Sequence, residues 1–270
     1  MYLKDSTLLL SATDLANHLA CKHLTELNRL AAEGELKKPF RSDPILETLI
    51  ERGNQHEQAY VDSLKAENEN VVEIDTRDVA AAVQQTIEAM KSGAEVIVQA
   101  CLSDDQWVGW PDLLVKVDRP SSIAPWSYEV GDTKLTTNTR AGTILQLCLY
   151  SDLLSKIQGV KPDKFYVIKP GEPFLVDEFK FNDFRAYYRF VKKSLEDKVS
   201  EASGITTYPE PVTHCDICRW WTRCNKTRRD DDHLTFVAGI QKTHIAELER
   251  QGVEKPVSYT HLTLPTILLV

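Results

Sequence analysis

The sequence contains no long apolar run. Nowhere among its 270 residues do eighteen uncharged apolar residues follow one another, so the sequence predicts no membrane-spanning helix. The first residues, MYLKDSTLLLSATD, contain only a short leucine run and no small-residue cleavage site, which argues against a secretory signal. We therefore expect a soluble, cytoplasmic protein without a membrane partner.

Positive charge is also scarce, with 32 lysines and arginines against 40 aspartates and glutamates and a formal net charge of −8. This balance argues against a protein that coats nucleic acid through bulk charge, although an acidic body can still carry a local basic groove. Internal repeats and low-complexity tracts are absent as well. The length suits one sizeable domain or two small ones with an ordinary core.

Cysteines are few, and half of them cluster. Disulfides are disfavoured in a reducing compartment, so the spacing of the six cysteines points first to metal or redox chemistry. Cys215, Cys218 and Cys224 have the spacing C-x2-C-x5-C, which lets one short loop direct several thiolates at a common centre. A fourth ligand must come from elsewhere. A structural zinc site is the rival to an iron–sulfur cluster, because His23 or His214 could complete a tetrahedron.

Helix signals recur along the chain. A first helix is expected from Ser11, which forms a capping box with Asp14, toward a stop at Gly34, with Cys21 in its middle. Further helices are expected after Asp43-Pro44, from about Asp78 to Lys91, from about Thr139 to Ile157, and from Asn182 to about Val199.

Strand signals lie between these helices. A short strand is expected at VVEI, and the β-rich runs EVIVQACL, WVGWPDLLVKV and WSYEVGDTKL are expected to form neighbouring strands of one sheet. Two more strands are expected at KFYVIK and PFLVDEFKF. This order of elements predicts an α/β fold, or α+β with mixed pairing.

Two of these strands carry a pattern suited to phosphodiester hydrolysis. Asp112 is an acid in an otherwise apolar strand, and Asp132 is followed two positions later by Lys134, on the same strand face. Glu129, three residues before Asp132, faces the opposite way, and we exclude it from the site. Two carboxylates suit a divalent ion that polarises water and phosphate, and a lysine can steady the developing negative charge.

The order of motifs resembles that of RecB-like nucleases of the PD-(D/E)xK superfamily. RG-x-x-HE is followed by PD, D-x-K, Q-x-x-x-Y and a terminal cysteine cluster. The iron–sulfur form is similar to AddB-type and CRISPR-associated nuclease domains, and the LSATDL opening with C-x-H-L-T is closer to a RecB-family nuclease group. The resemblance covers most of residues 8 to 229. It implies a restriction-endonuclease-like core, a central mixed sheet flanked by helices, and a helical region stapled by the cluster.

The resemblance also implies roles for the matching residues. His56, Asp112 and Asp132 would bind Mg²⁺ or Mn²⁺ through their side chains, Thr133 through its backbone carbonyl, Lys134 would orient or activate the water, and Gln146 and Tyr150 would position the DNA backbone. The i, i+4 spacing of Gln146 and Tyr150 independently places them on one helix face. Taken singly, His56 is as compatible with a hydrogen-bonded helix histidine, Asp112 with a solvated strand edge, and the last two with an ordinary helix face.

For the cysteines, the resemblance implies a [4Fe–4S] cluster held by Cys21, Cys215, Cys218 and Cys224, with zinc as the rival. Cys101 and Cys148 are expected to be small buried hydrophobes, and Cys148 to face away from Gln146 and Tyr150. Around the cluster, cations alternate with tryptophans, a mixture suited to phosphate contact and base stacking, although it also fits a solvated basic loop. The candidate DNA contacts are Arg140, Arg219, Trp220, Trp221 and Arg223, with Lys226, Arg228 and Arg229 nearby.

Three segments are expected: a RecB-like nuclease domain with its cluster at 1–235, the start of a truncated helix-hairpin-helix-like segment at 236–255, and a non-native tail at 256–270. In longer members of the group further domains follow, sometimes helicase-like, so the chain is expected to be the front part of a larger enzyme.

The expected function is that of a Mg²⁺- or Mn²⁺-dependent exodeoxyribonuclease acting on single-stranded DNA or DNA ends, in repair, recombination or processing. The alternative is a non-catalytic nucleic-acid-binding module with a structural iron–sulfur or zinc site. The complete set of Asp112, Asp132 and Lys134 favours the enzyme.

Overall fold

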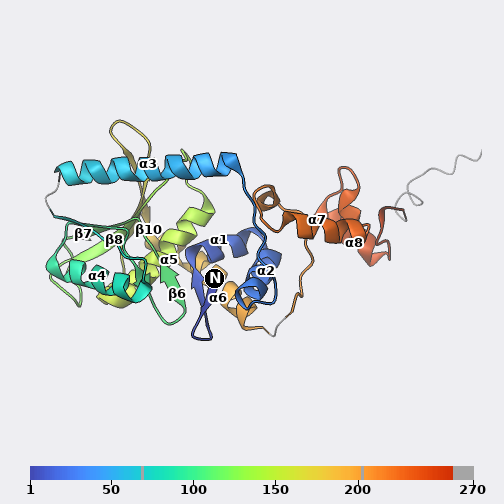
Figure 1. Cartoon of the computed structure of the whole chain (residues 1–270), viewed down its shortest axis with the longest axis horizontal. Coiled ribbons are helices and arrows are strands. Elements are labelled where there is room, and N and C mark those ends of the chain that lie inside the picture. Colours follow the sequence, from blue (N-terminus) through green and yellow to red (C-terminus); the bar gives the residue numbers. More distant parts are fainter. Residues whose placement is uncertain (68–69, 202–203, 258–270) are drawn as a thin grey trace, which may run out of the picture.

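The computed structural model describes residues 1–67, 70–201 and 204–257, and it has a mixed α/β architecture with two sheets flanked by helices (Figure 1). The four-stranded sheet has the order β1 (Tyr2–Lys4), β2 (Thr7–Ser11), β6 (Trp107–Gly109) and β5 (Leu102–Ser103). The six-stranded sheet has the order β10 (Leu175–Lys180), β9 (Lys164–Lys169), β8 (Ser127–Thr133), β7 (Leu113–Val117), β4 (Val96–Val98) and β3 (Val71–Glu73). Both sheets mix parallel and antiparallel pairs, which confirms the predicted mixed α/β class.

The main helices are α1 (Ala12–Ala20), α2 (Lys22–Ala32), α3 (Pro44–Glu67), α4 (Val79–Ser92), α5 (Ala141–Gln158), α6 (Phe181–Ser200), α7 (Trp221–Asp230) and α8 (Lys242–Arg250). Within the described ranges, none of the helices is long and apolar enough to cross a bilayer. Most of the sequence-predicted non-native tail, from residue 258 onward, lies outside the described residues.

Side-chain caps explain where α3 and α4 begin. The backbone N–H groups of Ile45 and Leu46 donate to Asp43 Oδ1 at 3.1 and 3.3 Å, and Pro44 occupies the first turn, where its missing N–H costs nothing. Asp78 caps α4 in the same way, accepting from the Ala81 N–H at 2.9 Å. Both starts are where the sequence predicts them.

The first predicted helix is wrong in one respect, because it breaks into α1 and α2 at Cys21. The backbone of Cys21 is extended, with φ −161° and ψ 111°. The break lets α1 pack against α5 through Leu15 while α2 turns to bury Leu24 and Leu27 against another part of the chain. One straight helix could not satisfy both contacts.

Two of the β-rich runs also differ from the prediction, because each is divided between the two sheets. EVIVQACL forms β4 and β5, separated at Gln99, whose φ of 53° lies in the left-handed region. WVGWPDLLVKV forms β6 and β7, separated at Pro111, which cannot donate to a sheet ladder. Asp112 therefore lies in the connection before β7 rather than within a strand.

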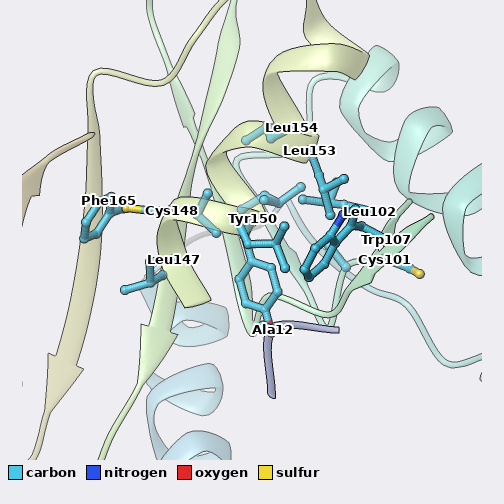
Figure 2. Close-up of a cluster of buried hydrophobic side chains, with 14 of the residues drawn as sticks. Ala12, Cys101, Leu102, Trp107, Leu147, Cys148, Tyr150, Leu153, Leu154 and Phe165 are labelled. Carbon is cyan, nitrogen blue, oxygen red and sulfur yellow. The ribbon is translucent and has the colours of Figure 1, made fainter. Parts of the chain in front are cut away.

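The main core lies between the six-stranded sheet and helices α4 and α5, while α3 covers the other face through Val61 (Figure 1). Cys101 and Cys148 are fully buried in this core, as predicted. Figure 2 shows Cys148 beside Phe165, whereas Tyr150 on the same helix points in another direction, toward Ala12. Helix α5 thus fills the core with one face and presents another to the ends of the strands.

Candidate active site and cysteine pocket

Asp112 and Asp132 lie at adjacent strand ends, because β7 and β8 pair with Leu113 opposite Gly131. The Asp112 Oδ2 atom accepts hydrogen bonds from the Thr133 backbone N–H at 2.7 Å and from the Thr133 hydroxyl at 2.9 Å. These two bonds fix the Asp112 carboxylate against the end of β8, next to Asp132.

Asp132 is fully buried, and its two oxygens have different partners. Oδ1 accepts from the Gln146 amide at 3.1 Å. Oδ2 lies against the Lys134 ammonium as an ion pair but accepts no hydrogen bond of regular geometry from any described residue. Burial, reinforced by the nearby charge of Asp112, raises the pKa of Asp132. Burial alone would lower the pKa of Lys134, but Asp132 and Asp112 together raise it.

Gln146 and Tyr150 lie on one face of α5, as their spacing predicts. The Gln146 amide that donates to Asp132 also donates to the Tyr150 hydroxyl at 3.1 Å. Tyr150 is only 5% exposed, and its ring packs so closely on Gly109 that a Cβ there would lie 2.6 Å from Tyr150 Cδ1. Tyr150 therefore contacts Gln146 from within the core.

His56 reaches the same strand ends from α3, on the opposite face of the sheet from α5. Its Nε2 lies 3.4 Å from the Ile168 carbonyl oxygen, which also accepts the Lys134 backbone N–H at 2.8 Å. Its ring lies 5.6 Å from that of Phe174. The structure thus brings Asp112, Asp132, Lys134 and Gln146 into one cluster, with His56 at the margin and bonded to a carbonyl rather than to a carboxylate.

Glu57 is a member of this neighbourhood that the sequence analysis did not single out. Its carboxylate accepts a hydrogen bond from the Gln99 amide, and burial followed by the charge of Asp112 raises the pKa of Glu57. The Gln99 backbone N–H donates to the Asp112 carbonyl at 2.8 Å, so Gln99 links Glu57 to the Asp112 segment. The RG-x-x-HE motif contains Glu57, but nothing in the sequence indicates the left-handed backbone of Gln99.

Glu129 makes none of these contacts. Its carboxylate accepts the backbone N–H groups of Asp163 and Lys164 at 3.0 and 2.9 Å and the Tyr166 hydroxyl at 2.6 Å. These partners agree with its predicted exclusion from the site.

The carboxylates of Asp112 and Asp132 suit a hard divalent cation. In the conformations of residues 1–67, 70–201 and 204–257, no three His, Cys, Asp or Glu side chains are gathered closely enough to hold a metal ion. The cation beside Asp132 is instead the Lys134 ammonium. Two carboxylates side by side, one with an oxygen lacking a regular hydrogen bond, offer the oxygen ligands that Mg²⁺ and Mn²⁺ prefer.

The four cysteines that the resemblance singles out line one small pocket, although Cys21 is almost 200 residues from the other three. Leu24, Leu27 and Trp220 pack around it. Burial, with a contribution from the neighbouring thiols, raises the pKa of Cys224 to about 11. Four thiols have the ligand chemistry of an iron–sulfur or zinc site, although in the conformations of the described residues they do not converge closely enough to hold a metal.

Both candidate histidines of the zinc alternative, His23 and His214, also line the pocket. His23 Nδ1 is bonded to the Thr207 hydroxyl at 2.9 Å, and burial lowers the pKa of both imidazoles. Each histidine is thus a neutral neighbour of the thiols near pH 7, and His23 has one ring nitrogen already engaged.

The predicted role of Trp220 in base stacking is wrong. Trp220 is 2% exposed, and its indole N–H donates to Asn28 at 2.9 Å. Arg228 is also buried and donates to the Pro209 carbonyl at 2.9 Å, so it supports the fold rather than facing a phosphate. Arg140, Arg219, Trp221 and Arg223 are exposed.

Comparisons with known proteins add little to this geometry. No family model matches the chain, and no curated protein matches it. Among solved structures, the chain is similar to the crystal structure of SSO0001, with 12% identity over 83% of this chain and 88% of that chain and a TM-score of 0.39. At that TM-score the likeness carries no argument about fold or function.

Proposed function

We propose that this protein is a divalent-metal-dependent nuclease that hydrolyses phosphodiester bonds of DNA, and that it belongs to the RecB-like branch of the PD-(D/E)xK superfamily. The observation that carries the proposal is the contact of Asp132 with both Lys134 and Gln146, beside the Asp112 carboxylate. These residues come from three separate motifs of the sequence. An ordinary surface carboxylate would lie in solvent, whereas Asp132 is fully buried.

Asp112 and Asp132 are the residues that would hold Mg²⁺ or Mn²⁺, with His56, Glu57 and the Thr133 carbonyl at the margin of the site. When bound, the ion supplies Lewis acidity toward the phosphate and the attacking water. Lys134 places a positive charge at the same point, where it can stabilise negative charge that develops on the phosphate. Gln146 fixes the orientation of Asp132, and Tyr150 fixes Gln146.

We further propose that Cys21, Cys215, Cys218 and Cys224 hold a [4Fe–4S] cluster, with zinc as the rival occupant. The cluster would join the break between α1 and α2 to α7 and the loop that precedes it, and so stabilise the fold directly. Its place outside the six-stranded sheet separates it from the proposed chemistry. A role in DNA repair, recombination or processing in the cytoplasm completes the proposal.

The test is cleavage of end-labelled single- and double-stranded DNA by anaerobically purified protein, with Mg²⁺, with Mn²⁺ and with chelator. We expect cleavage with metal, none with chelator, and none with Asp132→Asn, which keeps the side-chain volume and the contact with Gln146. A circular substrate distinguishes exonuclease from endonuclease activity. DNA binding without cleavage under every metal condition would overturn the enzyme and leave the non-catalytic binding module.

A further inference from the structure

The linker between α2 and α3 contacts the loop that carries Cys215 and Cys218. Its segment KKPFR places Arg41 so that Nη1 donates to the Cys218 carbonyl at 3.0 Å and Nη2 to the Asp216 carbonyl at 2.7 Å. These bonds join positions 175 and 177 residues apart. They fix the neighbouring residue, Phe40, beside the start of α7.

An open pocket of about 590 Å³ lies at this junction, and two exposed aromatic side chains line it. Phe40 is 93% exposed and Trp221 is 45% exposed. Within the described part of the chain, neither ring has an aromatic or cation–π partner. Together the two rings present apolar surface beside one pocket, and such surface rimmed by polar residues is typical of binding sites.

Positive charge is concentrated around the same pocket. Arg41 and Arg219 line it, against one acid, Asp216. Further cations lie near these lining residues: Lys37 and Lys38 precede Phe40 in the linker, and Arg223, Lys226 and Arg229 are exposed on α7, where Lys226 pairs with Asp230. In a chain of net charge −8, this local excess is complementary to a polyanion.

We propose that this pocket, lined by Phe40, Arg41, Arg219 and Trp221, binds the bases and backbone of an unpaired nucleic-acid strand. The inference deepens the proposed function by naming the form of the substrate. Every unpaired base has a flat face that can stack on an aromatic ring, and the adjacent cations track the phosphates. A duplex hides those faces within its own stack, so the pocket selects for single strands. A protein partner would fit the rings less well, because the charge around them is mainly positive, with Asp216 as the one acid among the residues that line the pocket.

The experiment measures binding alone, by fluorescence anisotropy with chelator present. The probes are a labelled oligothymidylate and a duplex of the same length. Phe40→Ala and Trp221→Ala are each expected to weaken binding of the single strand by about 5- to 100-fold and to change duplex binding little. Phe190→Ala is the matched control, because Phe190 is a 71% exposed phenylalanine on α6 that lines a different pocket. Arg219→Gln is expected to reduce the slope of log affinity against log salt concentration by less than one unit, as for the loss of a single phosphate contact.

Wild-type affinity in both aromatic variants, with circular dichroism and metal content unchanged, would overturn the proposal. An equal loss of single-strand and duplex binding would also overturn it, because stacking would then not be the source of the affinity. Failure of the proposed function has a different signature. A protein that binds the single strand through Phe40 and Trp221 but never cleaves with added metal would retain this pocket and lose the nuclease assignment.

Discussion

The ammonium of Lys134 lies directly against the carboxylate of Asp132, and that carboxylate is fully buried. The pair places a positive charge where a divalent ion is also expected to bind. Removing the lysine therefore has two consequences, one for the chemistry and one for the stability of the protein without metal.

For Lys134→Met we expect cleavage to fall at least about 100-fold, the usual cost of losing one charge-stabilising group. Without bound metal, the variant should also unfold at a lower temperature near pH 7, because Asp132 loses its cationic partner. Added Mn²⁺ should raise the unfolding temperature of Lys134→Met more than it raises that of the wild type. Thermal unfolding with and without Mn²⁺ measures the effect, and wild-type cleavage rates would contradict the role of Lys134.

Glu57→Gln is expected to weaken Mn²⁺ binding and cleavage by about 10- to 100-fold, because residues that border a metal site commonly have effects of this size. The substitution keeps the volume of the side chain and a partner for Gln99. Glu51→Gln, an exposed change on the same helix, is the matched control and should leave both quantities unchanged. Titration calorimetry with Mn²⁺ gives the affinity independently of activity. Equal affinities in the two variants would remove Glu57 from the site.

Cys21→Ser tests the cysteine pocket, since only the fold joins this residue to the other three cysteines. After anaerobic purification, the wild type should be brown and contain iron and sulfide, whereas the variant should lose most of the iron and the visible absorption. Cys148→Ala, a buried cysteine in the main core, should retain both. Full iron content in Cys21→Ser would exclude it as a ligand. If the wild type instead contains stoichiometric zinc, the proposed occupant changes from a [4Fe–4S] cluster to zinc, and the four cysteine ligands stay the same.

Two glycine substitutions should have opposite effects on stability. Gly109→Ala should destabilise the protein by about 1–3 kcal/mol, because the new methyl group would meet the Tyr150 ring in a packed core. The displaced ring should also lower cleavage through Gln146. Gly53→Ala lies within α3 with nothing within 4 Å of the added methyl group, so it should stabilise the protein by about 0.5–1 kcal/mol. Equilibrium unfolding of both variants checks the two signs, and equal effects would contradict the packing argument.

The lowered pKa of His18 predicts that the protein loses stability on acidification. Burial, followed by the charges of Lys22 and Lys198, lowers the pKa of His18 to about 4, against 6.5 for the free side chain. Between these values the unfolded chain binds a proton that the folded protein does not, so this contribution is present above pH 6.5 and is lost toward pH 4. The upper limit is about 3 kcal/mol.

His18→Gln should flatten the dependence of the unfolding free energy on pH between 6.5 and 4, as measured by denaturant titrations at several pH values. The glutamine keeps polar atoms near the hydroxyls of Thr25 and Ser194, which contact the imidazole at 3.0 Å. An unchanged slope in the variant would assign the acid sensitivity to other groups.

The features that the sequence predicts well are those decided locally. The caps at Asp43 and Asp78 need only a side chain and the first turn of its own helix. The shared face of Gln146 and Tyr150 likewise follows from the helical period alone.

The features that the sequence does not predict depend on distant partners. The break at Cys21 exists because α1 and α2 pack on different elements, and Trp220 is buried because α2 supplies Asn28 and Leu27. A tryptophan beside arginines has the same sequence appearance whether it faces solvent or a helix synthesised much earlier. The place of Glu57 depends in turn on Gln99, whose left-handed backbone has no sequence signal.

The contacts of α2 also impose an order of events on the growing chain. Glu26 receives hydrogen bonds from Thr206 and Thr207, Arg29 donates to the Glu201 carbonyl, and Asn28 accepts from Trp220, all from segments translated more than 170 residues later. At ordinary rates of translation this interval is roughly 10–40 s. Throughout it, Glu26, Asn28 and Arg29 lack these hydrogen-bond partners, and Cys21 lacks the other three cysteines. If the proposed cluster is bound, its complete ligand set is therefore available only late in synthesis, after Cys224 has left the ribosome.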